Sequence, residues 1–559
     1  MLLSNMELLA TAPGGVAKLR ELILTLAVQG KLVPQDPADE PASVLLQKIR
    51  AEKDRLMAEG KIKRDKPLAE IGEEEKPFEL PAGWEWVRLG STMEMLNGRA
   101  FKPSEWMDAG LPIVRIQNLN NPNASFNYCD PSTVVDKNRI DDGAFLISWS
   151  GTPGTSFGAF IWSRGAAALN QHIFKCVLIG RVFLPEFLRL SINSQLNVLI
   201  AQAQGGVGLQ HVTKGVLENL VLVLPPLAEQ SRIVTRVEAL MRLCDALEAK
   251  GQLEAAQHAQ LVSTLLGTLT ASTTPEELAA HWQRVAQHFD LLLDRPEAID
   301  ALEQTLLQLA VRGLLVPQDP TDEPASALLQ KIRAEKDRLI ATGQIKQGKP
   351  LPPITDEEKP FELPVGWEWV RWANVAMKIG DIDHKMPSEA KDGVPYVSPR
   401  DFYGTNEIDF DGAKKIAYSD YVELASKIRP EAGDLIYPRY GTIGVVRKVT
   451  TDREFLASYS CAVIKVLPGF IEPDYQYLFS VSGCAKAQAA SATNKTTQPN
   501  VGLKSIQEFL VPLPPLAEQS RIVTRITALR RLCVDLRQRL AERQSVQARL
   551  AEALVQEVA

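Results

Sequence analysis

Residues 224–236 read LPPLAEQSRIVTR, and the same thirteen letters return at 513–525. In each copy an apolar, strand-like run comes first, and two prolines then end the strand where a helix can begin. Apolar residues follow at alternating spacings of four and three, along 233–247 and again along 522–540. This heptad pattern predicts two helices that each pack lengthwise against another helix along an apolar seam. A chain that repeats this device is built as two halves.

The surroundings of the two seams are repeated as well. Residues 33–56 and 316–339 agree at 22 of 24 positions, and residues 77–88 and 360–371 agree at 11 of 12. The first pair predicts a helix that begins near Pro41 in the first half. The second pair alternates aromatic and acidic residues between prolines, which favours an extended strand that enters a domain.

Two long segments, about 90–220 and 373–510, lie between these repeated frames and differ almost everywhere. Both contain short β-type runs separated by Gly, Pro, Asn and Asp, and they share a skeleton of glycines with a Gly-Thr turn. Each segment is predicted to form a compact domain. The predicted fold is α+β, with two mixed, mostly β domains separated and joined by long antiparallel helical (coiled-coil) regions in a pseudo-twofold internal repeat.

The repeats also predict domain boundaries. The six regions are an N-terminal helical region with its linker (1–83), the first β domain (84–225), a central helical spacer (226–312), a second helix and linker (313–366), the second β domain (367–514) and a C-terminal helix (515–559). If the halves obey a pseudo-twofold axis, we expect the N-terminal helices to pack on the C-terminal seam and the middle helices on the first seam.

Length and composition exclude several classes of protein. A chain of 559 residues is too long for one core, so three or more folded units are expected. The N-terminus lacks the basic region and apolar run of a signal peptide, and no stretch reaches 18 uncharged apolar residues, so no membrane partner is expected. The six cysteines are scattered without a CxxC pair. We therefore expect a reduced, cytoplasmic protein without disulfides or zinc.

The net charge of −6 argues, taken alone, against a nucleic-acid partner, although a global value can hide a local basic face. Residues 373–505 hold 16 basic and 16 acidic residues, and residues 90–220 are slightly positive. Non-specific affinity for phosphate should therefore be weak for the isolated chain. Tight, specific binding is expected to need partner subunits.

Near-identical frames around unlike segments have a physical interpretation. The frame must meet the same partner twice, while each segment meets something different. A reader of double-stranded DNA fits this arrangement, because two domains on a stiff helical spacer resemble the fixed half-site spacing of dimeric DNA-binding proteins. Inserting one heptad after Leu247 should then change the distance between the two target halves and leave their letters unchanged.

The paired LPPLAEQSRIVTR segments, the paired VPQDP–EPAS–LLQKIRAEKDRL segments and the FELPxGWEWVR entries resemble the specificity subunits of type I restriction–modification systems. The resemblance covers essentially the whole chain and makes the two β domains target-recognition domains. It implies a non-catalytic subunit that reads a bipartite target in double-stranded DNA. It also implies two methyltransferase (modification) subunits and two restriction–translocation subunits as partners, which would use S-adenosylmethionine, ATP and magnesium.

Other functions remain alternatives. The chain could read DNA within a different defence or modification assembly, or it could be a coiled-coil scaffold that binds no DNA, or an autonomous enzyme. The sequence contains no GxxxxGK[ST] phosphate loop, no FxGxG cofactor loop, no NPPY- or DPPY-type methylation motif and no HExxH. The glycine-rich residues 205–208 lie in a polar loop, so a nucleotide site there is disfavoured.

Candidate DNA contacts in the first domain are polar residues in loops or after strands. Arginine pairs with guanine edges, and glutamine or asparagine with adenine edges, so the cluster after residues 112–114 suits the major groove. Solvated charge, a turn or a flexible loop is the competing explanation at each place. The candidates are Arg99, Lys102, Arg115, Gln117, Asn118, Trp149, Ser150, Thr152, Gln171, His172, Gln210 and His211.

The second domain offers a matching set. The glycine turn places Arg439, Tyr440 and Thr442 where Trp149, Ser150 and Thr152 lie in the first domain. Ser398, Arg400 and Asp401 are aligned with Ile116, Asn118 and Leu119. The candidates are Lys385, Ser398, Arg400, Arg439, Tyr440, Thr442, Lys495, Thr497, Gln498 and Asn500.

Two tryptophans near each domain entrance are identical in the two halves. They could stack on bases, but identical aromatic residues outside unlike readers more simply attach each domain to the frame. We therefore expect a structural role for Trp84, Trp86, Trp367 and Trp369.

Overall fold

The computed structural model describes residues 6–60, 68–151, 157–196, 204–206, 209–382, 386–493 and 499–558. The chain forms two compact units. The first consists of Met1–Leu253 with Gln544–Ala559, and the second of Glu254–Arg543. Each unit has its own hydrophobic core and is described by itself.

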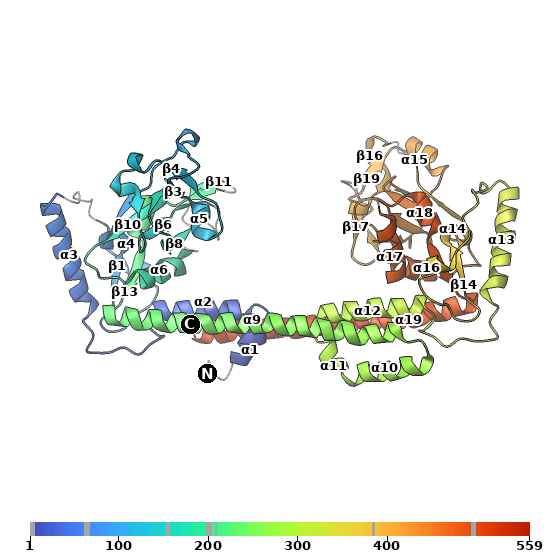
Figure 1. Ribbon diagram of the computed structural model, residues 1–559, viewed down its shortest axis with the longest axis horizontal. Coiled ribbons are helices and arrows are strands. Elements are labelled where there is room, and N and C mark those ends of the chain that lie inside the picture. The colour runs from blue at the N-terminus through green and yellow to red at the C-terminus, as the bar shows by residue number, and fades with distance from the viewer. Residues whose placement is uncertain are drawn as a thin grey trace. The chain divides into compact units, whose positions relative to one another are not determined.

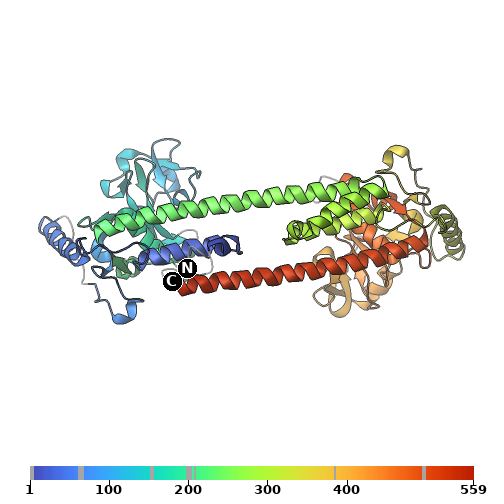
Figure 2. The same ribbon diagram turned by 90° about the horizontal axis from the view of Figure 1, so that it is seen from below.

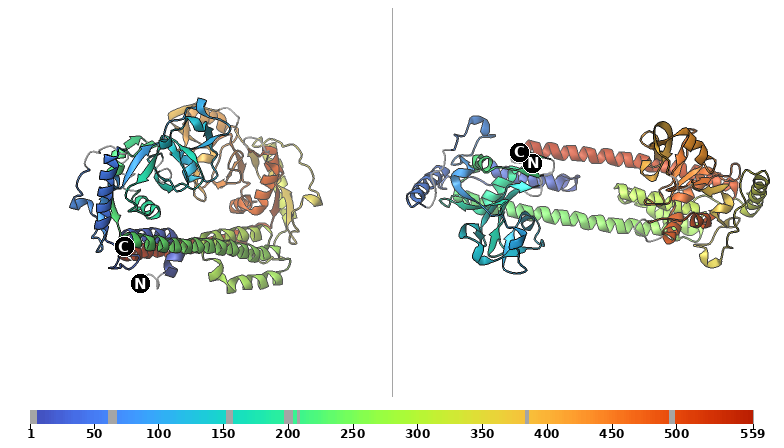
Figure 3. Two further views of the ribbon diagram at one scale, coloured as in Figure 1. Left: turned by 60° about the vertical axis from the view of Figure 1, so that its left-hand side comes forward. Right: turned by 90° about the horizontal axis from the view of Figure 1, so that it is seen from above.

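The helices of the first unit are α1 (Met6–Thr11), α2 (Gly15–Val28), α3 (Ala42–Ala58), α4 (Leu89–Thr92), α5 (Ile116–Asn120), α6 (Pro185–Ser194), α8 (Lys214–Asn219) and the first part of α9 (Leu227–Ala271). In Figure 1, α1, α2 and α9 lie below the β domain, whereas α4, α5 and α6 lie within it. Gly30 and Gly60, each at positive φ, lie two residues beyond the ends of α2 and α3. The helix α3 stands at the flank of the domain in both views of Figure 3.

Among the described residues, the strands of the first unit form two four-stranded sheets and two smaller ones. They are β1 (Glu85–Arg88), β2 (Met93–Asn97), β3 (Leu111–Val114), β4 (Asn127–Cys129), β5 (Arg139–Ile140), β6 (Phe145–Ser148), β7 (Ser150–Gly151), β8 (Gly158–Ile161), β9 (Ala167–Leu169), β10 (Ile173–Leu178), β11 (Gln204–Gly206), β12 (Leu209–His211) and β13 (Val221–Leu224). The sheet orders are β2-β10-β6-β8, β4-β3-β9-β5, β11-β12-β7 and β1-β13. The pair β3–β9 is parallel.

The second unit repeats this plan. Its helices are the rest of α9, α10 (Pro275–Gln287), α11 (Phe289–Leu292), α12 (Pro296–Val311), α13 (Ala325–Ala341), α14 (Trp372–Val375), α15 (Tyr418–Ala425), α16 (Pro473–Val481), α17 (Gly483–Ala492), α18 (Leu503–Glu508) and most of α19 (Leu516–Val558). Its strands are β14 (Glu368–Arg371), β15 (Lys378–Gly380), β16 (Glu389–Val397), β17 (Phe402–Tyr403), β18 (Glu407–Ile408), β19 (Lys414–Ile416), β20 (Leu435–Pro438), β21 (Arg447–Lys448), β22 (Leu456–Ala457), β23 (Cys461–Lys465) and β24 (Leu510–Leu513).

The two β domains share their topology although their sequences differ. The central sheet of the second domain has the order β15-β23-β20-β21, which corresponds strand by strand to β2-β10-β6-β8. The pair β16–β22 is parallel, as β3–β9 is. In both halves the entry strand pairs with the strand before the seam helix, as β1–β13 and β14–β24. The α+β fold with an internal repeat is therefore confirmed.

The seam helices pack as the heptads predict, but their partners are not the expected ones. Ile233, Val237 and Cys244 of α9 are buried in the same core as Leu19 and Ile23 of α2. The end of α19 lies on the other side of α2 (Figure 2), where Lys18 Nζ approaches Glu552 Oε2 at 3.2 Å. The N-terminal helix thus packs on the first seam, so the expectation that it packs on the C-terminal seam is wrong.

The second unit shows the same choice of partner. Ile522, Ile526 and Cys533 of α19 share a core with α12, together with Val262 and Leu266 from the end of α9. The middle helix α12 therefore packs on the second seam. Each opening helix is held by the seam of its own half and by the far end of the other long helix.

The repeated tryptophans attach each domain to its frame, as expected. Trp84 Nε1 donates to Glu229 Oε2 at 2.9 Å, and Trp367 Nε1 donates to Glu518 Oε2 at 2.9 Å. Trp86 packs against Phe78, with ring centroids 5.1 Å apart. The second tryptophan of the other half, Trp369, packs on Phe361 in the same way.

All six cysteines are buried and unpaired, and Cys244 and Cys533 lie on the seams as small apolar residues. Within the described ranges, no helix combines the length and apolarity that a bilayer span requires.

Candidate nucleic-acid interface

In the first domain, polar residues lie together where the parallel strands β3 and β9 end. The carboxyl ends of parallel strands lie at one edge of a sheet, here at Val114 and Leu169. The Asn170 amide donates to the Val114 carbonyl at 3.1 Å, and the Arg99 amide donates to the Leu169 carbonyl at 3.0 Å. Arg99, Arg115 and Gln171 are therefore brought to this edge, which we call the first edge.

The neighbouring sheet adds residues to the first edge. The strand β6 ends at Ser148, opposite the start of β10 at Ile173. The Trp149 amide then donates to the His172 carbonyl at 3.4 Å, and the two rings lie 5.4 Å apart. In the small sheet β11-β12-β7, Ser150 pairs with His211 and Gly151 with Gln210. Candidates from five separate stretches thus meet, while Thr152 lies outside the described residues.

The second domain builds a corresponding edge, the second edge, at the carboxyl ends of β16 and β22. The Ser458 amide donates to the Val397 carbonyl at 2.7 Å, and the Arg439 amide donates to the Ser460 carbonyl at 2.8 Å. Tyr440 forms an isolated bridge with Asn500. The predicted residues Ser398, Arg400, Arg439, Tyr440, Thr442 and Asn500 lie at or beside this edge, and Lys385, Lys495, Thr497 and Gln498 lie outside the described residues.

The two edges use the same backbone hydrogen bonds. Asn170 of the first edge corresponds to Ser458 of the second, because each amide donates to the last residue of the parallel neighbour strand. Trp149 likewise corresponds to Arg439: the carbonyl of each accepts from a valine amide at 2.9 Å, Val212 in one domain and Val501 in the other. Equivalent backbone positions therefore carry unlike side chains.

The turns after β3 and β16 correct the alignment made from sequence. The Arg115 amide donates to Asn118 Oδ1 at 3.0 Å, and the Ser398 amide donates to Asp401 Oδ2 at 2.7 Å. Asn118 therefore corresponds to Asp401, and Gln117 to Arg400. The alignment of Ser398, Arg400 and Asp401 with Ile116, Asn118 and Leu119 is wrong by one residue, because only the turn geometry fixes the register between such unlike sequences.

Several predicted side chains are engaged within the protein. Asn118 is 1% exposed and its Nδ2 donates to the carbonyls of Ala124 and Ser125, so it holds the turn. Arg439 is buried, forms an ion pair with Asp381 and donates from Nε to the Val501 carbonyl at 3.2 Å. Asn118 and Arg439 therefore stabilise the fold at their edges.

Arg99 and Lys102 form a small charged loop with Glu105. Arg99 Nη2 lies 2.7 Å from Glu105 Oε1, and its guanidinium carbon lies 4.1 Å from the centre of the Phe101 ring. The backbone amide of Lys102 and the guanidinium of Arg99 lower the pKa of the Glu105 carboxyl. The Lys102 side chain is exposed and contributes a positive charge to the first edge.

Arg115 shows contacts that the sequence did not reveal. Its Nη1 donates to Asn127 Oδ1 at 3.2 Å, and its guanidinium carbon lies 5.8 Å from the centre of the Trp106 ring. Trp106 is 41% exposed. At the second edge Tyr459, one residue after Ser458, lies 6.2 Å from Tyr440 between ring centres. Trp106, Asn127 and Tyr459 were missed because strand pairing, and not sequence spacing, brings them here.

The edges lie away from the flanking helices of their own units. In Figure 1, α5 and β11 lie on the side of the first domain opposite α3, and β17 lies on the side of the second domain opposite α13. The helix α5 begins directly after Arg115, and β17 begins directly after Asp401. Each edge therefore lies on the side of its domain away from the flanking helix of its own unit.

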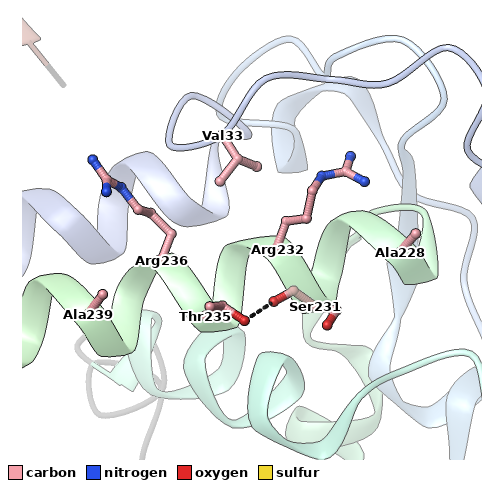
Figure 4. A pocket seen from close by; sticks show the side chains of 7 residues that line it. All are labelled: Val33, Ala228, Ser231, Arg232, Thr235, Arg236 and Ala239. Atoms are coloured by element: carbon pink, nitrogen blue, oxygen red, sulfur yellow. Dashed lines mark hydrogen bonds between the residues drawn. The ribbon is translucent and has the colours of Figure 1, made fainter.

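A second feature occurs on the seam helices. Figure 4 shows a shallow groove on α9, lined by Val33, Ala228, Ser231, Arg232, Thr235, Arg236 and Ala239, with Val33 above the helix between the two arginines. Arg232 pairs with Asp39 at 2.6 Å, and its equivalent Arg521 pairs with Asp322 at 2.6 Å. The exposed face of this identical sequence is therefore built in the same way in both units.

Comparisons with known proteins show the family of this chain. A family model described as "Type I restriction modification DNA specificity domain" matches residues 81–257 and 364–543. The Type I restriction enzyme EcoEI specificity subunit of Escherichia coli is 35% identical over 568 residues, covering 97% of this chain and 93% of that protein. The EcoAI specificity subunit of Escherichia coli is 36% identical over 563 residues, with the same coverage.

Among solved structures, a chain from work on complex assembly and conformational transition of the type I R–M system is similar to this one. It is 18% identical, covers 86% of this chain and 99% of its own length, and has a TM-score of 0.48.

Proposed function

Because this chain belongs to the type I restriction–modification DNA specificity family and is a DNA-recognition subunit of such a system, we propose that its first and second edges each read one half of a split target in double-stranded DNA. The supporting observation is the pair of matched edges: the same backbone hydrogen bonds hold unlike polar side chains at equivalent positions. Base edges in the major groove are distinguished by such side chains, while a common scaffold sets their placement.

The experiment that tests this function maps methylated adenines in host DNA with and without the chain. A two-part motif with unspecified bases between the parts, present only with the chain, is the expected result. Replacing residues 90–220 by the corresponding segment of a relative with another target should change one part and leave the other. A continuous motif, or a change in both parts, would contradict the proposal.

The partners are proposed as two methyltransferase subunits and two restriction–translocation subunits. The duplicated face of the seam helices supports a partner bound twice, because Thr235 and Arg236 are exposed on α9 as their equivalents Thr524 and Arg525 are on α19. Each face continues to an exposed leucine, Leu243 at 54% and Leu532 at 57% exposed. The same exposed leucine at equivalent positions of the two helices supports a surface that meets one kind of partner twice.

In this proposal the chain performs no chemistry itself. S-adenosylmethionine, ATP and magnesium belong to the partner subunits, and the residues of this chain position DNA. Assaying the purified chain with S-adenosylmethionine and target DNA tests this, since methyl transfer by the chain alone would contradict it.

The stoichiometry can be tested with charged substitutions on the duplicated face. Leu243→Glu and Leu532→Glu should each remove one methyltransferase from the complex, and the double variant should remove both, because a carboxylate buried in an apolar interface is costly. Native mass spectrometry of the reconstituted complex measures the count. Leu261→Glu, at an exposed leucine of α9 outside the duplicated segment, is the matched control. Two bound partners in the double variant would overturn the assignment of this face.

A further inference from the structure

Each of the turns that follow β3 and β16 contains one buried residue that caps the turn and one residue that is exposed. In both turns the fourth residue is buried and caps the first: Asn118 is 1% exposed and Asp401 is 9% exposed. The third residue, Gln117 or Arg400, is exposed, and the side chain of Arg400 reaches 75% exposure. The two turns therefore have equivalent backbones but expose different side chains.

The caps fix the backbone on which the exposed residue stands. The Asn118 amide donates back to the Arg115 carbonyl at 2.9 Å, and the Asp401 amide donates to the Ser398 carbonyl at 3.0 Å. The Ser398 hydroxyl also donates to Asp401 at 2.8 Å. With backbone and cap both bonded, little backbone conformational entropy is lost when the exposed side chain of each turn binds.

The exposed side chains are only weakly engaged within the protein. Gln117 Nε2 lies 3.5 Å from the Ser125 carbonyl, the outer limit of a hydrogen bond. Arg400 Nε lies 3.7 Å from Asp401 Oδ1, beyond normal hydrogen-bond length. Arg439, also at the second edge, is by contrast buried against Asp381. Gln117 and Arg400 can therefore turn their polar ends to a ligand at small cost.

The first residues of the turns do not form such a pair. Arg115 is held by Asn127 and lies beside Trp106, whereas the Ser398 hydroxyl is directed to the Asp401 cap. Substituting one for the other would disturb the cap or its neighbours. Positions 117 and 400 are thus the equivalent places in these two turns where the side chain is exposed in both domains.

Resting on the proposed function, we propose that Gln117 and Arg400 are equivalent specificity-determining residues, each contacting one base pair of its half-target in the major groove. A glutamine amide donates to and accepts from the edge of adenine, and a guanidinium donates twice to guanine. Gln117 therefore specifies an A·T pair in the half read by the first domain. Arg400 specifies a G·C pair in the half read by the second.

The experiment exchanges the two side chains in the complex of this chain with its methyltransferase subunits. Gln117→Arg should change one position of the first half-target from A·T to G·C, and Arg400→Gln should make the opposite change in the second half. Methylation rates on duplexes carrying each base pair at that position should shift in preference by about tenfold or more, as expected for a two-bond contact. Gln117→Ala should remove the preference without creating a new one.

Matched controls place the same charge change at the amino ends of β9 and β22, the parallel neighbours of β3 and β16. Ala166→Arg adds an exposed arginine before β9, and Arg453→Gln removes one before β22. Both should leave the motif unchanged, which separates base reading from general attraction to phosphate. A wild-type motif without two parts would refute the proposed function. A two-part motif whose letters are unchanged in Gln117→Arg and Arg400→Gln, or changed in the opposite half, would refute this inference alone.

Discussion

At the scale of single residues, the carboxylates that open the two seam helices anchor the domains. Glu518 is 1% exposed and accepts from Trp367 Nε1 at 2.9 Å. Burial raises the pKa of the Glu518 carboxyl, and the hydrogen bond from Trp367 lowers that pKa by less. The folded protein therefore binds a proton at Glu518 more tightly than the unfolded chain does.

Substitutions at Glu518 should separate the hydrogen bond from the charge. Glu518→Ala leaves the Trp367 N–H without its acceptor and should cost about 1–3 kcal/mol of stability. Glu518→Gln keeps an acceptor and avoids burying a charge, so it should be at least as stable as the wild type at neutral pH. Thermal unfolding of the full chain measures both, and equal losses in the two variants would contradict this account.

The sign of the pH dependence follows from the raised pKa. The contribution of Glu518 to stability is fully present below 4.5, the ordinary pKa of a glutamate, and is lost as the pH rises through the higher folded-state value. The difference in unfolding midpoint between wild type and Glu518→Gln should therefore move in favour of the glutamine variant as the pH rises across this window. A difference that is constant with pH would contradict it.

Residue roles were only partly predictable from the sequence. The tryptophans could be assigned to the frame because they repeat with it. Asn118 could not be recognised as a cap, since its partner amide at Arg115 and its carbonyl acceptors at Ala124 and Ser125 depend on how the chain turns. In the sequence, Arg439 looks like a side chain available to bind DNA, because its ion-pair partner Asp381 lies 58 positions away.

At the scale of elements, charge distinguishes the two helix pairs. On the first seam Arg20 of α2 lies 3.2 Å from Glu248 of α9, and on the second Glu303 of α12 lies 2.8 Å from Arg537 of α19. These pairs occupy equivalent positions with their charges reversed. The apolar seams are nearly identical, so opposite charge favours each opening helix on its own seam and disfavours the other.

Reversing one charge of the second pair should destabilise its unit. Glu303 is 15% exposed in its side chain and also binds Arg530 at 2.9 Å. Glu303→Arg therefore brings like charges together and should cost about 1–3 kcal/mol, with part regained when Arg537→Glu is added. A double-mutant cycle from unfolding midpoints measures the coupling, and strictly additive losses would contradict the pairing.

The helices could be predicted from heptads, but their partners could not. The apolar pattern of 233–247 suits either opening helix, and the pseudo-twofold argument alone selected the wrong one. The reversed charges of Arg20 and Glu303 carried the missing information. They become readable only when the two helices are compared position by position against both seams.

At the scale of the whole molecule, two long helices connect the units. The helix α9 begins in the first unit and its residues from 254 onward belong to the second, whereas α19 begins in the second and ends in the first. Ala551 of α19 is buried in the core of the first unit. Each long helix therefore carries residues that pack in the cores of both units.

Lengthening both helices tests whether they set the target spacing. One heptad adds about 10 Å of helix, which corresponds to roughly three base pairs. Matched insertions after Leu247 and Leu536 should lengthen the gap between the target halves and keep their letters. Methylation mapping reads the gap, and an unchanged gap in the matched variant would mean that other elements set it.

The capped turns after β3 and β16 also bear on how new recognition could arise. Because Asn118 and Asp401 maintain the loop while their neighbours face outward, a codon change at 117 or 400 leaves the supporting bonds untouched. Libraries randomised at these two codons should consist largely of folded protein. A preference for a new base pair could then be acquired by single substitutions, with a stable protein at each step.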